Sequence, residues 1–257
     1  MIDAHCHLSF PDFDNKRDRI VEESKKTMTA IIDSAPSIEN SEKSLALARK
    51  YPGFVFSCLG LHPEDIINLD EKQIDDYANF VRSNRDNIVA VGEVGIDNFH
   101  VKMDADRKKC RDVFAVFIEL AKEIRKPLVI HAREDNGEAA KILEEQGAKD
   151  VILHCFGSPQ LVDTVVVNKW FVSIPTLIVR SKKHVRLAKE VPIELILTET
   201  DSPFLSPSHG ETNIPQNVKY VIESIASARG VEFDEVDRIT TENAIKAFNL
   251  PIRPKTV

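Results

Sequence analysis

The segment NIVAVGEVGID, at residues 87–97, combines a buried-strand pattern with polar groups that such a strand does not ordinarily contain. Its apolar run IVAV (88–91) has the length and the branched side chains of a strand that is buried on both faces. Glu93 follows between two glycines, where the backbone is expected to approach another group closely. A buried carboxylate is costly unless a partner offsets its loss of hydration. The stretch therefore predicts a buried strand that ends in a functional site.

Seven further apolar runs accompany this one, and charged amphipathic stretches separate them. The runs lie at residues 1–8, 28–35, 54–62, 127–133, 150–156, 170–176 and 194–203. Residues 106–126 show the clearest helical pattern, with apolar residues at three- and four-residue steps. Another helix is expected to start at Ser158 and Pro159, and residues 213–248 are interpreted as closing helices. Apolar strands that alternate with helices indicate a parallel sheet covered by helices.

Eight such units predict a closed α/β barrel of the TIM type, (β/α)8, for which a doubly wound sheet is the main alternative. The chain of 257 residues is long enough to bury a sizeable core. It shows no Pro/Gly-rich linker, low-complexity tract or obvious repeat. We therefore expect residues 1–257 to form a single domain, with its functional site at the C-terminal strand ends.

The composition restricts the class of function. With 42% hydrophobic and 29% charged residues, the chain has the composition of a soluble globular protein. Its net charge of -7 disfavours a general nucleic-acid coat or binding to anionic membranes, but bound cations or a basic rim could still hold phosphates. The four cysteines lack metal-site or redox spacing, and no signal-peptide pattern precedes them, which favours the cytoplasm. No apolar run approaches the ~20 residues of a membrane span, and nothing implies an obligate protein partner.

Polar residues follow or end most of the apolar runs. They are His5, His7, His62, Glu93, Asp97, His131, Arg133, His154, Glu199 and Asp201. In a parallel barrel all C-terminal strand ends lie at one mouth, so residues that are distant in sequence converge there. Pairs two residues apart on one strand, including Glu199 with Asp201, are expected to share a strand face. One such residue has an ordinary structural explanation, whereas seven or more at one mouth indicate a site.

This mixture of imidazoles and carboxylates, without a matching set of thiolates, fits divalent cations such as zinc, manganese or magnesium. The candidate ligands outnumber what one tetrahedral ion needs. Two ions that share a bridging carboxylate are the natural arrangement. Such two-metal sites usually hydrolyse phosphate or acyl bonds.

The motifs, taken together and in order, resemble the TatD family of metal-dependent hydrolases and deoxyribonucleases, within the amidohydrolase-like barrel superfamily. The matching stretches are DAHCHL (3–8), GLHP (60–63), GEVGID (92–97), PLVIHAR (127–133), LHCF (153–156), ETDSPFL (199–205) and TENAIKAF (241–248). They span nearly the whole chain.

The resemblance implies which residues bind the metals. His5, His7 and Asp201 would hold one ion together with Glu93. His131 and His154 would hold the second, with Glu93 as the bridge. The catalytic residues would be Asp201, which orients or deprotonates a metal-activated water, Glu93, and His62 beside the substrate phosphate. Family membership further implies hydrolysis of ester bonds (EC class 3.1), namely cleavage of DNA, often from the 3′ end of single strands.

The chain departs from the family pattern in three places. Many relatives carry an Arg-Asn-Glu-Pro-like stretch where this chain has TNIPQN (212–217), so Thr212 and Ile214 replace charged residues while Asn213 remains a candidate substrate contact. The segment GSPQ (157–160) is a residue shorter than the common pattern. Phe117 occupies a position where relatives often have glutamine. None of these positions is a proposed metal ligand.

Each assignment has a structural alternative. His5 and His7 could belong to a solvated N-terminus, Glu93 could be a helix cap, and Asp201 could cap a turn. His131 and His154 could be core histidines, although their matched positions on adjacent strands favour ligation. His62 could simply shape the turn before Pro63. Arg133 fits a structural carboxylate partner and a substrate phosphate equally well, whereas Glu199 fits a group that orients a ligand.

Other polar residues are assigned to the surface or the core. His100, His184 and His209 have no partner pattern and are expected at the surface. Cys6 and Cys155 flank ligands but should point away from the site as small core residues. The basic clusters RKKCR (107–111) and SKKHVR (181–186) are most often solvated helix faces, and the second is the better candidate for nucleic-acid contact.

Two other functions remain open. The chain could hydrolyse a different bond, such as an amide, an ester or an aminoacyl linkage, because a fold does not determine a function. Many amidohydrolase relatives bridge their metals with a modified lysine. Glu93 as the bridge here favours a phosphodiesterase. A binding protein that has lost turnover would be expected to lack a ligand, and none is missing.

Overall fold

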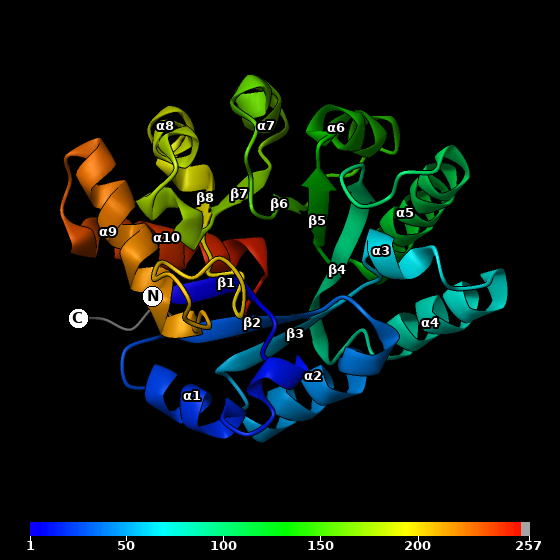
Figure 1. The fold of residues 1–257 in the computed structure, drawn as a ribbon, viewed down its shortest axis with the longest axis horizontal. Helices are drawn as coiled ribbons and strands as arrows, with labels where there is room; N and C mark the ends of the chain where they lie inside the picture. The colour runs from blue at the N-terminus through cyan, green and yellow to red at the C-terminus, as the bar shows by residue number, and fades with distance from the viewer. Residues whose placement is uncertain (253–257) are drawn as a thin grey trace.

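The computed structural model, which describes residues 1–252, contains one sheet of eight strands in the order β1 to β8. The strands are β1 (Ile2–Cys6), β2 (Ala30–Ala35), β3 (Val55–Leu59), β4 (Ile88–Asp97), β5 (Leu128–Arg133), β6 (Val151–Leu153), β7 (Phe171–Ile174) and β8 (Ile196–Thr198). All neighbours in this order pair in parallel. Strands β8 and β1 also lie together, and Thr198 Oγ1 donates to the Ile2 carbonyl at 3.1 Å. The predicted TIM-type barrel is therefore confirmed, as a nearly closed barrel (Figure 1).

Helices follow the strands and surround the sheet (Figure 1). They are α1 (Arg17–Ser24), α2 (Ile38–Lys50), α3 (Pro63–Ile66), α4 (Glu71–Ser83), α5 (Asp104–Ile124), α6 (Asn136–Glu145), α7 (Val162–Asn168), α8 (Lys182–Glu190), α9 (Val218–Arg229) and α10 (Phe233–Ala247). Within residues 1–252, no helix is both long enough and apolar enough to cross a membrane. Helix α10 contributes Ala244, and Phe248 follows it. Both residues belong to the same buried apolar cluster as Ile2 and Phe56.

Local sequence signals explain several helix boundaries. The predicted helix at 106–126 is α5, which buries Val113, Phe114 and Phe117 along one face, as the three- and four-residue steps require. Helix α4 begins with a capping box, in which Asp70 and Gln73 satisfy each other's backbone N–H groups. At the end of α9, Gly230 takes a left-handed conformation (φ 69°) that closes the last turn.

Two predicted boundaries are wrong. The segment at Ser158 forms a 3-10 turn at Pro159–Leu161 before α7 begins, and the Ser158 side chain does not cap it. Strand β8 ends at Thr198, so Glu199 and Asp201 lie beyond the sheet. Asp201 has a φ of 57°, and this left-handed residue breaks the two-residue alternation that the sequence predicted for the pair.

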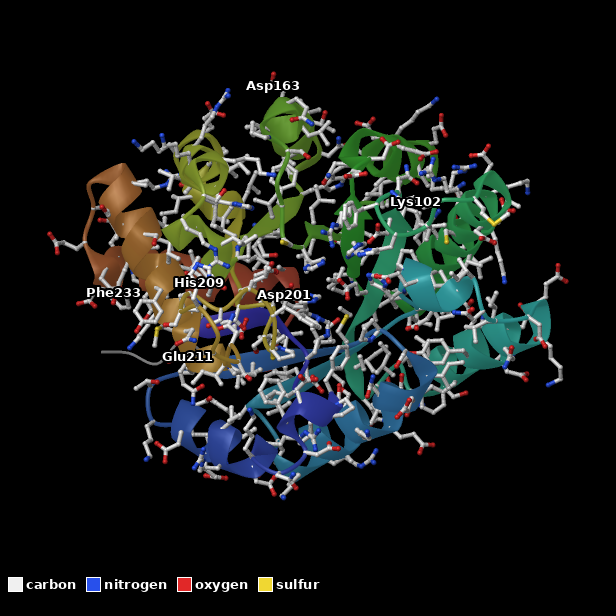
Figure 2. All side chains as sticks on the ribbon, in the orientation of Figure 1. Lys102, Asp163, Asp201, His209, Glu211 and Phe233 are labelled. Atoms are coloured by element: carbon white, nitrogen blue, oxygen red, sulfur yellow. The ribbon has the colours of Figure 1, made fainter. Side chains whose placement is uncertain are left out.

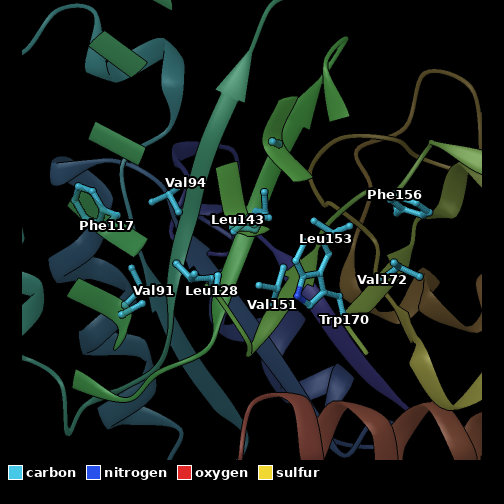
Figure 3. Packing of buried hydrophobic residues seen from close by; sticks show 14 of the residues in the cluster. Val91, Val94, Phe117, Leu128, Leu143, Val151, Leu153, Phe156, Trp170 and Val172 are labelled. Carbon is cyan, nitrogen blue, oxygen red and sulfur yellow. The ribbon is translucent and has the colours of Figure 1, made fainter. Parts of the chain in front are cut away.

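The layer between the sheet and its helices forms the largest apolar core. Figure 3 shows Phe117 of α5 facing Val91 and Val94 of β4, and Trp170 beside Val151 and Leu153. Phe117 and Trp170 are almost completely buried. Phe117 therefore fills an apolar part of this core, at a position where the family pattern often has glutamine.

Phe117→Ala should lower the free energy of unfolding by about 3–5 kcal/mol, because it removes a buried ring and leaves a cavity beneath α5. Chemical denaturation in the presence of a chelator measures this change. The neighbouring Val116 is 45% exposed on the same helix, so Val116→Ala should change stability by no more than about 0.5 kcal/mol. Equal stabilities of the two variants would contradict the packing described here.

Candidate metal centre

The predicted site residues converge at the C-terminal ends of the strands. Strand β1 and the residue after it supply His5 and His7; β4 supplies Glu93 and Asp97; β5 supplies His131 and Arg133. His62, His154, Glu199 and Asp201 follow β3, β6 and β8. Figure 2 shows Asp201 in the central part of the molecule, surrounded by the strands.

Irregular strand pairing in β1 and β4 turns side chains of these strands into the site. The registers of β1 and β2 shift between Asp3 and Cys6, and those of β4 and β5 shift between Gly92 and Val94, which leaves Glu93 as the extra residue. Such a bulge turns a side chain in a direction that a regular strand does not allow. At Gly95, a Cβ atom would lie 2.0 Å from the His131 carbonyl oxygen, so glycine permits this close approach of β4 to β5.

Glu93 lies at the centre of the cluster. Its Oε2 atom is 2.6 Å from His154 Nε2, 3.2 Å from His131 Nδ1 and 3.7 Å from His5 Nε2. Two groups of possible ligands share this carboxylate, one with His5 and His7 and the other with His131 and His154, and within each group the ligand atoms lie within 4.8 Å of one another. A carboxylate with imidazoles on both sides can bridge two ions.

The first group has the orientation that a metal requires. His7 Nδ1 must donate to the Ser34 carbonyl (2.9 Å), so Nε2 is the atom that faces Asp201 Oδ1 at 3.2 Å. His5 Nε2 is buried and has no hydrogen-bond partner within residues 1–252, although it lies 3.7 Å from carboxylate oxygens of both Glu93 and Asp201. A buried imidazole nitrogen without a partner, between two carboxylates, fits a divalent cation.

Further carboxylates hold the histidines of the second group. Asp97 accepts from His131 Nε2 (3.0 Å), which leaves Nδ1 facing Glu93. Glu199 accepts from the backbone N–H of Cys155 (2.8 Å) and from the Ser173 hydroxyl, and it lies 3.6 Å from His154 Nδ1. These contacts place Glu199 behind His154, where a carboxylate can orient an imidazole. Asp97 was expected at the strand end, but its contact with His131 was not predicted from the sequence.

Burial and charge shift the pKa values of these groups in opposite directions. Burial alone would raise the pKa of Glu93, but the charges of His154 and His5 and the hydrogen bond of His131 hold it well below its usual range. Burial also lowers the pKa of His5, and His154 adds to this effect. For His7 burial is outweighed by the hydrogen bond to Asp201 and the charge of Glu93, which raise its pKa to about 9. Without a metal, His7 therefore carries a proton near neutral pH, and this positive charge lies where a cation would bind.

Asp3, a residue that the sequence motifs did not single out, is a buried carboxylate beside the site. Asp3 accepts from the Thr200 N–H (2.9 Å), the Thr200 hydroxyl (2.6 Å) and the His5 N–H (3.3 Å). It thereby joins β1 to the loop that carries Asp201, whose own N–H donates to the His5 carbonyl at 2.9 Å. The signal was present, because Asp3 stands two residues before His5 in the HxH stretch.

The three residues expected to contact the substrate, His62, Arg133 and Asn213, lie in different surroundings. The His62 ring lies 4.3 Å from the His131 ring, and burial with the charge of His131 lowers its pKa to about 3. The Arg133 guanidinium is exposed and stacks 4.1 Å from the centre of the Phe99 ring. Asn213 is buried instead, and it donates to the Thr200 carbonyl (2.9 Å) and the Thr176 hydroxyl (3.1 Å).

Asn213 therefore has a different role from the one expected. Its oxygen also accepts hydrogen bonds, from the Ile214 N–H (3.0 Å) and the Asn217 amide (2.8 Å). Both polar atoms of its side chain are thus used within the protein, and the side chain holds the loop around Thr200. Of the two departures beside it, Thr212 is exposed and Ile214 packs partly buried against the cluster beneath α1.

Two other expectations, those for His184 and Cys155, were wrong. His184 is buried rather than at the surface, because α8 turns it inward onto Ser181 (Nδ1 to Oγ 2.8 Å). His100 is exposed, as expected, although its Nδ1 lies 2.9 Å from Asp97 and 3.1 Å from Glu64. Cys155 has a φ of 47° and is partly exposed, because the chain leaves the strand alternation after His154. By contrast, Cys6 is buried among apolar residues and His209 is exposed, as expected.

A cavity of about 760 Å³ opens beside the cluster. Its lining includes His131, His154 and Asp201 from the cluster, and Arg133, Lys183 and Leu205 from the surrounding loops and helices. Space next to candidate metal ligands allows a substrate to reach them. The arrangement is suited to metal-assisted hydrolysis of a bond that lies within this cavity.

Metal binding should weaken as the pH falls below about 9, because a ligand must lose its proton and His7 holds one up to that pH. The apparent affinity for zinc should fall by up to about tenfold per pH unit for each proton displaced. Competition with a chelator of known affinity measures it. Calorimetry in two buffers of different ionisation enthalpy counts the protons released.

His209→Gln provides the matched control, because His209 is exposed and lies outside the ligand groups. This variant should show the same pH dependence as the parent protein. An affinity that stays constant between about pH 9 and about pH 7 would contradict the place given to His7.

Comparison with known proteins supports the same interpretation. The family model described as TatD related DNase matches residues 2–249. The human protein named deoxyribonuclease TATDN3 is 36% identical, over 96% of this chain and 94% of its own length. A protein of Methanocaldococcus jannaschii named uncharacterized metal-dependent hydrolase MJ1582 is also 36% identical, over 96% of each chain.

Among solved structures, the TatD homolog YJJV of Escherichia coli K12 has a TM-score of 0.89 and 26% identity, and the match covers 98% of each chain. The whole-chain family match, the relatives above 30% identity and the convergent ligand groups agree with one another. This chain therefore belongs to the TatD related DNase family and is a metal-dependent hydrolase of that family.

Proposed function

We propose that this protein is a two-metal phosphodiesterase that cleaves DNA, acting from the 3′ end of single strands. The observation that carries the proposal is the position of Glu93. One of its carboxylate oxygens, Oε2, faces His5 on one side and His131 and His154 on the other. A bridging carboxylate between two sets of imidazoles is suited to two ions that act together on one phosphate. The name of the human relative, a deoxyribonuclease, supports DNA as the substrate.

The proposed ligands are divided between two ions. His5, His7 and Asp201 hold the first together with Glu93, while His131 and His154 hold the second with the same glutamate. Divalent ions in these places, either zinc, magnesium or manganese, would make a water nucleophilic near neutral pH and would neutralise charge on the phosphate. The protein's own contribution is to fix the ligands, through Ser34 on His7 and Asp97 on His131.

Asp201 is the proposed group that orients the attacking water and accepts its proton. Its side chain is 14% exposed, and it lines the cavity where a substrate would lie. The hydrogen bond between its N–H and the His5 carbonyl (2.9 Å) fixes the carboxylate beside both histidines of the first group. A base held in this way is already oriented to accept a proton from a water in the cavity.

His62 and Arg133 are the proposed contacts to the substrate. Because the pKa of His62 is lowered to about 3, this imidazole is neutral near pH 7 and can donate one hydrogen bond to a phosphate oxygen without adding charge. Arg133 has no carboxylate partner within residues 1–252, so its guanidinium is available to a phosphate. Its stacking on Phe99 holds the group near the cavity without neutralising it.

Cleavage of an end-labelled single-stranded DNA oligonucleotide tests the proposal directly. The protein should lose activity in EDTA and regain it with magnesium, manganese or zinc. The product ladder should shorten from the 3′ end. His131→Ala, purified and assayed in parallel, should be inactive, because it removes a ligand of the second ion, and this control excludes a contaminating nuclease.

If the folded protein binds metal but cleaves no DNA with any of these ions, the phosphodiesterase proposal is wrong. The substrate would then be sought among amides, esters and aminoacyl linkages on the same scaffold. Cleavage of equal strength by His131→Ala would likewise contradict the assignment.

Asp201→Asn should reduce kcat on the same oligonucleotide by about 10²- to 10⁴-fold, the usual contribution of a positioned acid–base group. Asparagine tolerates the left-handed conformation of residue 201 (φ 57°), so thermal unfolding of the variant should stay close to that of the parent. Comparison of kcat and of the unfolding midpoint separates the two effects. Undiminished turnover would remove the role given to this carboxylate.

A further inference from the structure

One cation on the cavity wall has no role in the metal centre. Lys183, in the first turn of α8, lines the same cavity as His154 and Asp201. It is exposed and has no hydrogen bond or ion pair within the part of the chain that the structure describes. Elsewhere the surface lysines Lys72 and Lys108 each contact an aspartate at 2.6 Å. A lysine that faces a cavity without a carboxylate partner is free to bind an anion.

The loop after β6 leaves space for the ammonium group of Lys183. A Cβ atom on Gly157 would lie 2.9 Å from Lys183 Nζ and 3.4 Å from its Cε. Glycine at this position, in the loop after β6, therefore lets the lysine side chain lie against the backbone at the cavity edge. A larger residue would have to displace the end of the lysine, which is flexible, rather than the backbone.

The position of Lys183 on its helix is electrostatically unfavourable. The start of α8 is capped by the Ser181 side chain, and its first turn contains Lys182 and Lys183 but no acidic residue. The helix dipole favours negative charge at this end, so two lysines there are destabilising until an anion arrives. Lysines at the start of a helix depart from the usual preference for negative charge there. Such a departure at a cavity wall is a sign of a functional requirement.

A buried neighbour adds a second polar group to this wall. His184 is only 3% exposed and lines the same cavity, and its Nε2 atom has no hydrogen-bond partner within the described residues. A buried nitrogen without a partner is uncommon and calls for a ligand or a solvent molecule. Lys183 and His184 thus add to the cavity lining one cation and one buried imidazole whose Nε2 has no partner within the described residues.

We propose that Lys183 binds a phosphate of the substrate other than the one that is cleaved. This inference rests on the proposed function, because it assumes a substrate with several phosphates. The cleaved phosphate belongs between the carboxylates and imidazoles around Glu93, whereas Lys183 contacts the edge of the cavity near Gly157. The cavity, at about 760 Å³, has room for more than one phosphodiester group. The subsite would favour oligonucleotides over diesters that carry a single phosphate.

Two substrates distinguish this subsite from the catalytic one. The first is a short single-stranded DNA oligonucleotide, and the second is bis(p-nitrophenyl) phosphate, which has only one phosphate. We define the substrate ratio as kcat/KM for the oligonucleotide divided by kcat/KM for bis(p-nitrophenyl) phosphate. For Lys183→Gln we expect this ratio to fall about tenfold, through a higher KM for the oligonucleotide. The dependence of log KM on log salt should also become less steep by about 0.7, the value for one contact to a single strand.

Lys182→Gln is the matched control, because Lys182 has the same charge in the same helical turn but does not line the cavity. It should leave both the ratio and the salt dependence as in the parent protein. Equal effects of the two substitutions would reveal only a general influence of charge and would overturn the proposal. A ratio that Lys183→Gln leaves unchanged would overturn it as well.

Gly157→Ala supplies an independent variant that keeps the lysine. The added methyl group should displace the ammonium and lower the same ratio, and it should have no further effect in the Lys183→Gln background. Additive effects of the two substitutions would contradict the contact.

Failure of the proposed function has a different signature. If the parent protein cleaves neither substrate with any metal, the phosphodiesterase proposal fails, and the lysine subsite falls with it. Parent activity on both substrates with an unaltered ratio in Lys183→Gln would overturn the subsite alone.

Discussion

The buried carboxylate of Glu93 is the constraint on which the arrangement of the site depends. A charge removed from water must be compensated, and here imidazoles from three other strand ends surround one oxygen atom. Each imidazole can face Glu93 only if its strand ends at the right height and its ring is held in the right orientation. The barrel supplies the first condition, because all its strands are parallel and end at one mouth. Hydrogen bonds behind the ring supply the second.

Those hydrogen bonds form a layer of buried carboxylates beneath the ligands. Asp3 holds the Thr200 backbone, Asp97 holds His131, and Glu199 holds the backbone after His154. Burial raises the pKa of Asp3, whereas hydrogen bonds from His131 and His100 outweigh burial and lower that of Asp97. The pKa values of the two acids thus shift in opposite directions, because burial outweighs the hydrogen bonds that Asp3 accepts, whereas the imidazoles beside Asp97 outweigh its burial. This layer fixes the geometry before any ion binds, which lets the metal enter a site that is already ordered.

The sequence predicted the barrel and the convergence of the ligands, because both follow from periodicity and from the position of polar residues at strand ends. It could not predict the extra residue at Glu93 or the left-handed backbone at Asp201, since both arise where strand alternation stops. For the same reason the expectations failed for Cys155, which follows a strand end in a left-handed conformation. His184 and Asn213 were misplaced because a loop or helix turned them inward, and a single polar residue carries no signal of that direction.

The distribution of charge around the mouth bears on how an acidic protein can receive a polyanion. The chain has a net charge of -7, and its metal centre adds carboxylates to the floor of the cavity. Cations bound there would reverse the sign of the field at the place that a phosphate must approach, and they act over a short range at physiological salt. Side-chain cations at the wall extend that field outward, provided that no acid neutralises them. Arg133 stacks on an aromatic ring and Lys183 lies beside Gly157, so neither cation is neutralised by a carboxylate within residues 1–252.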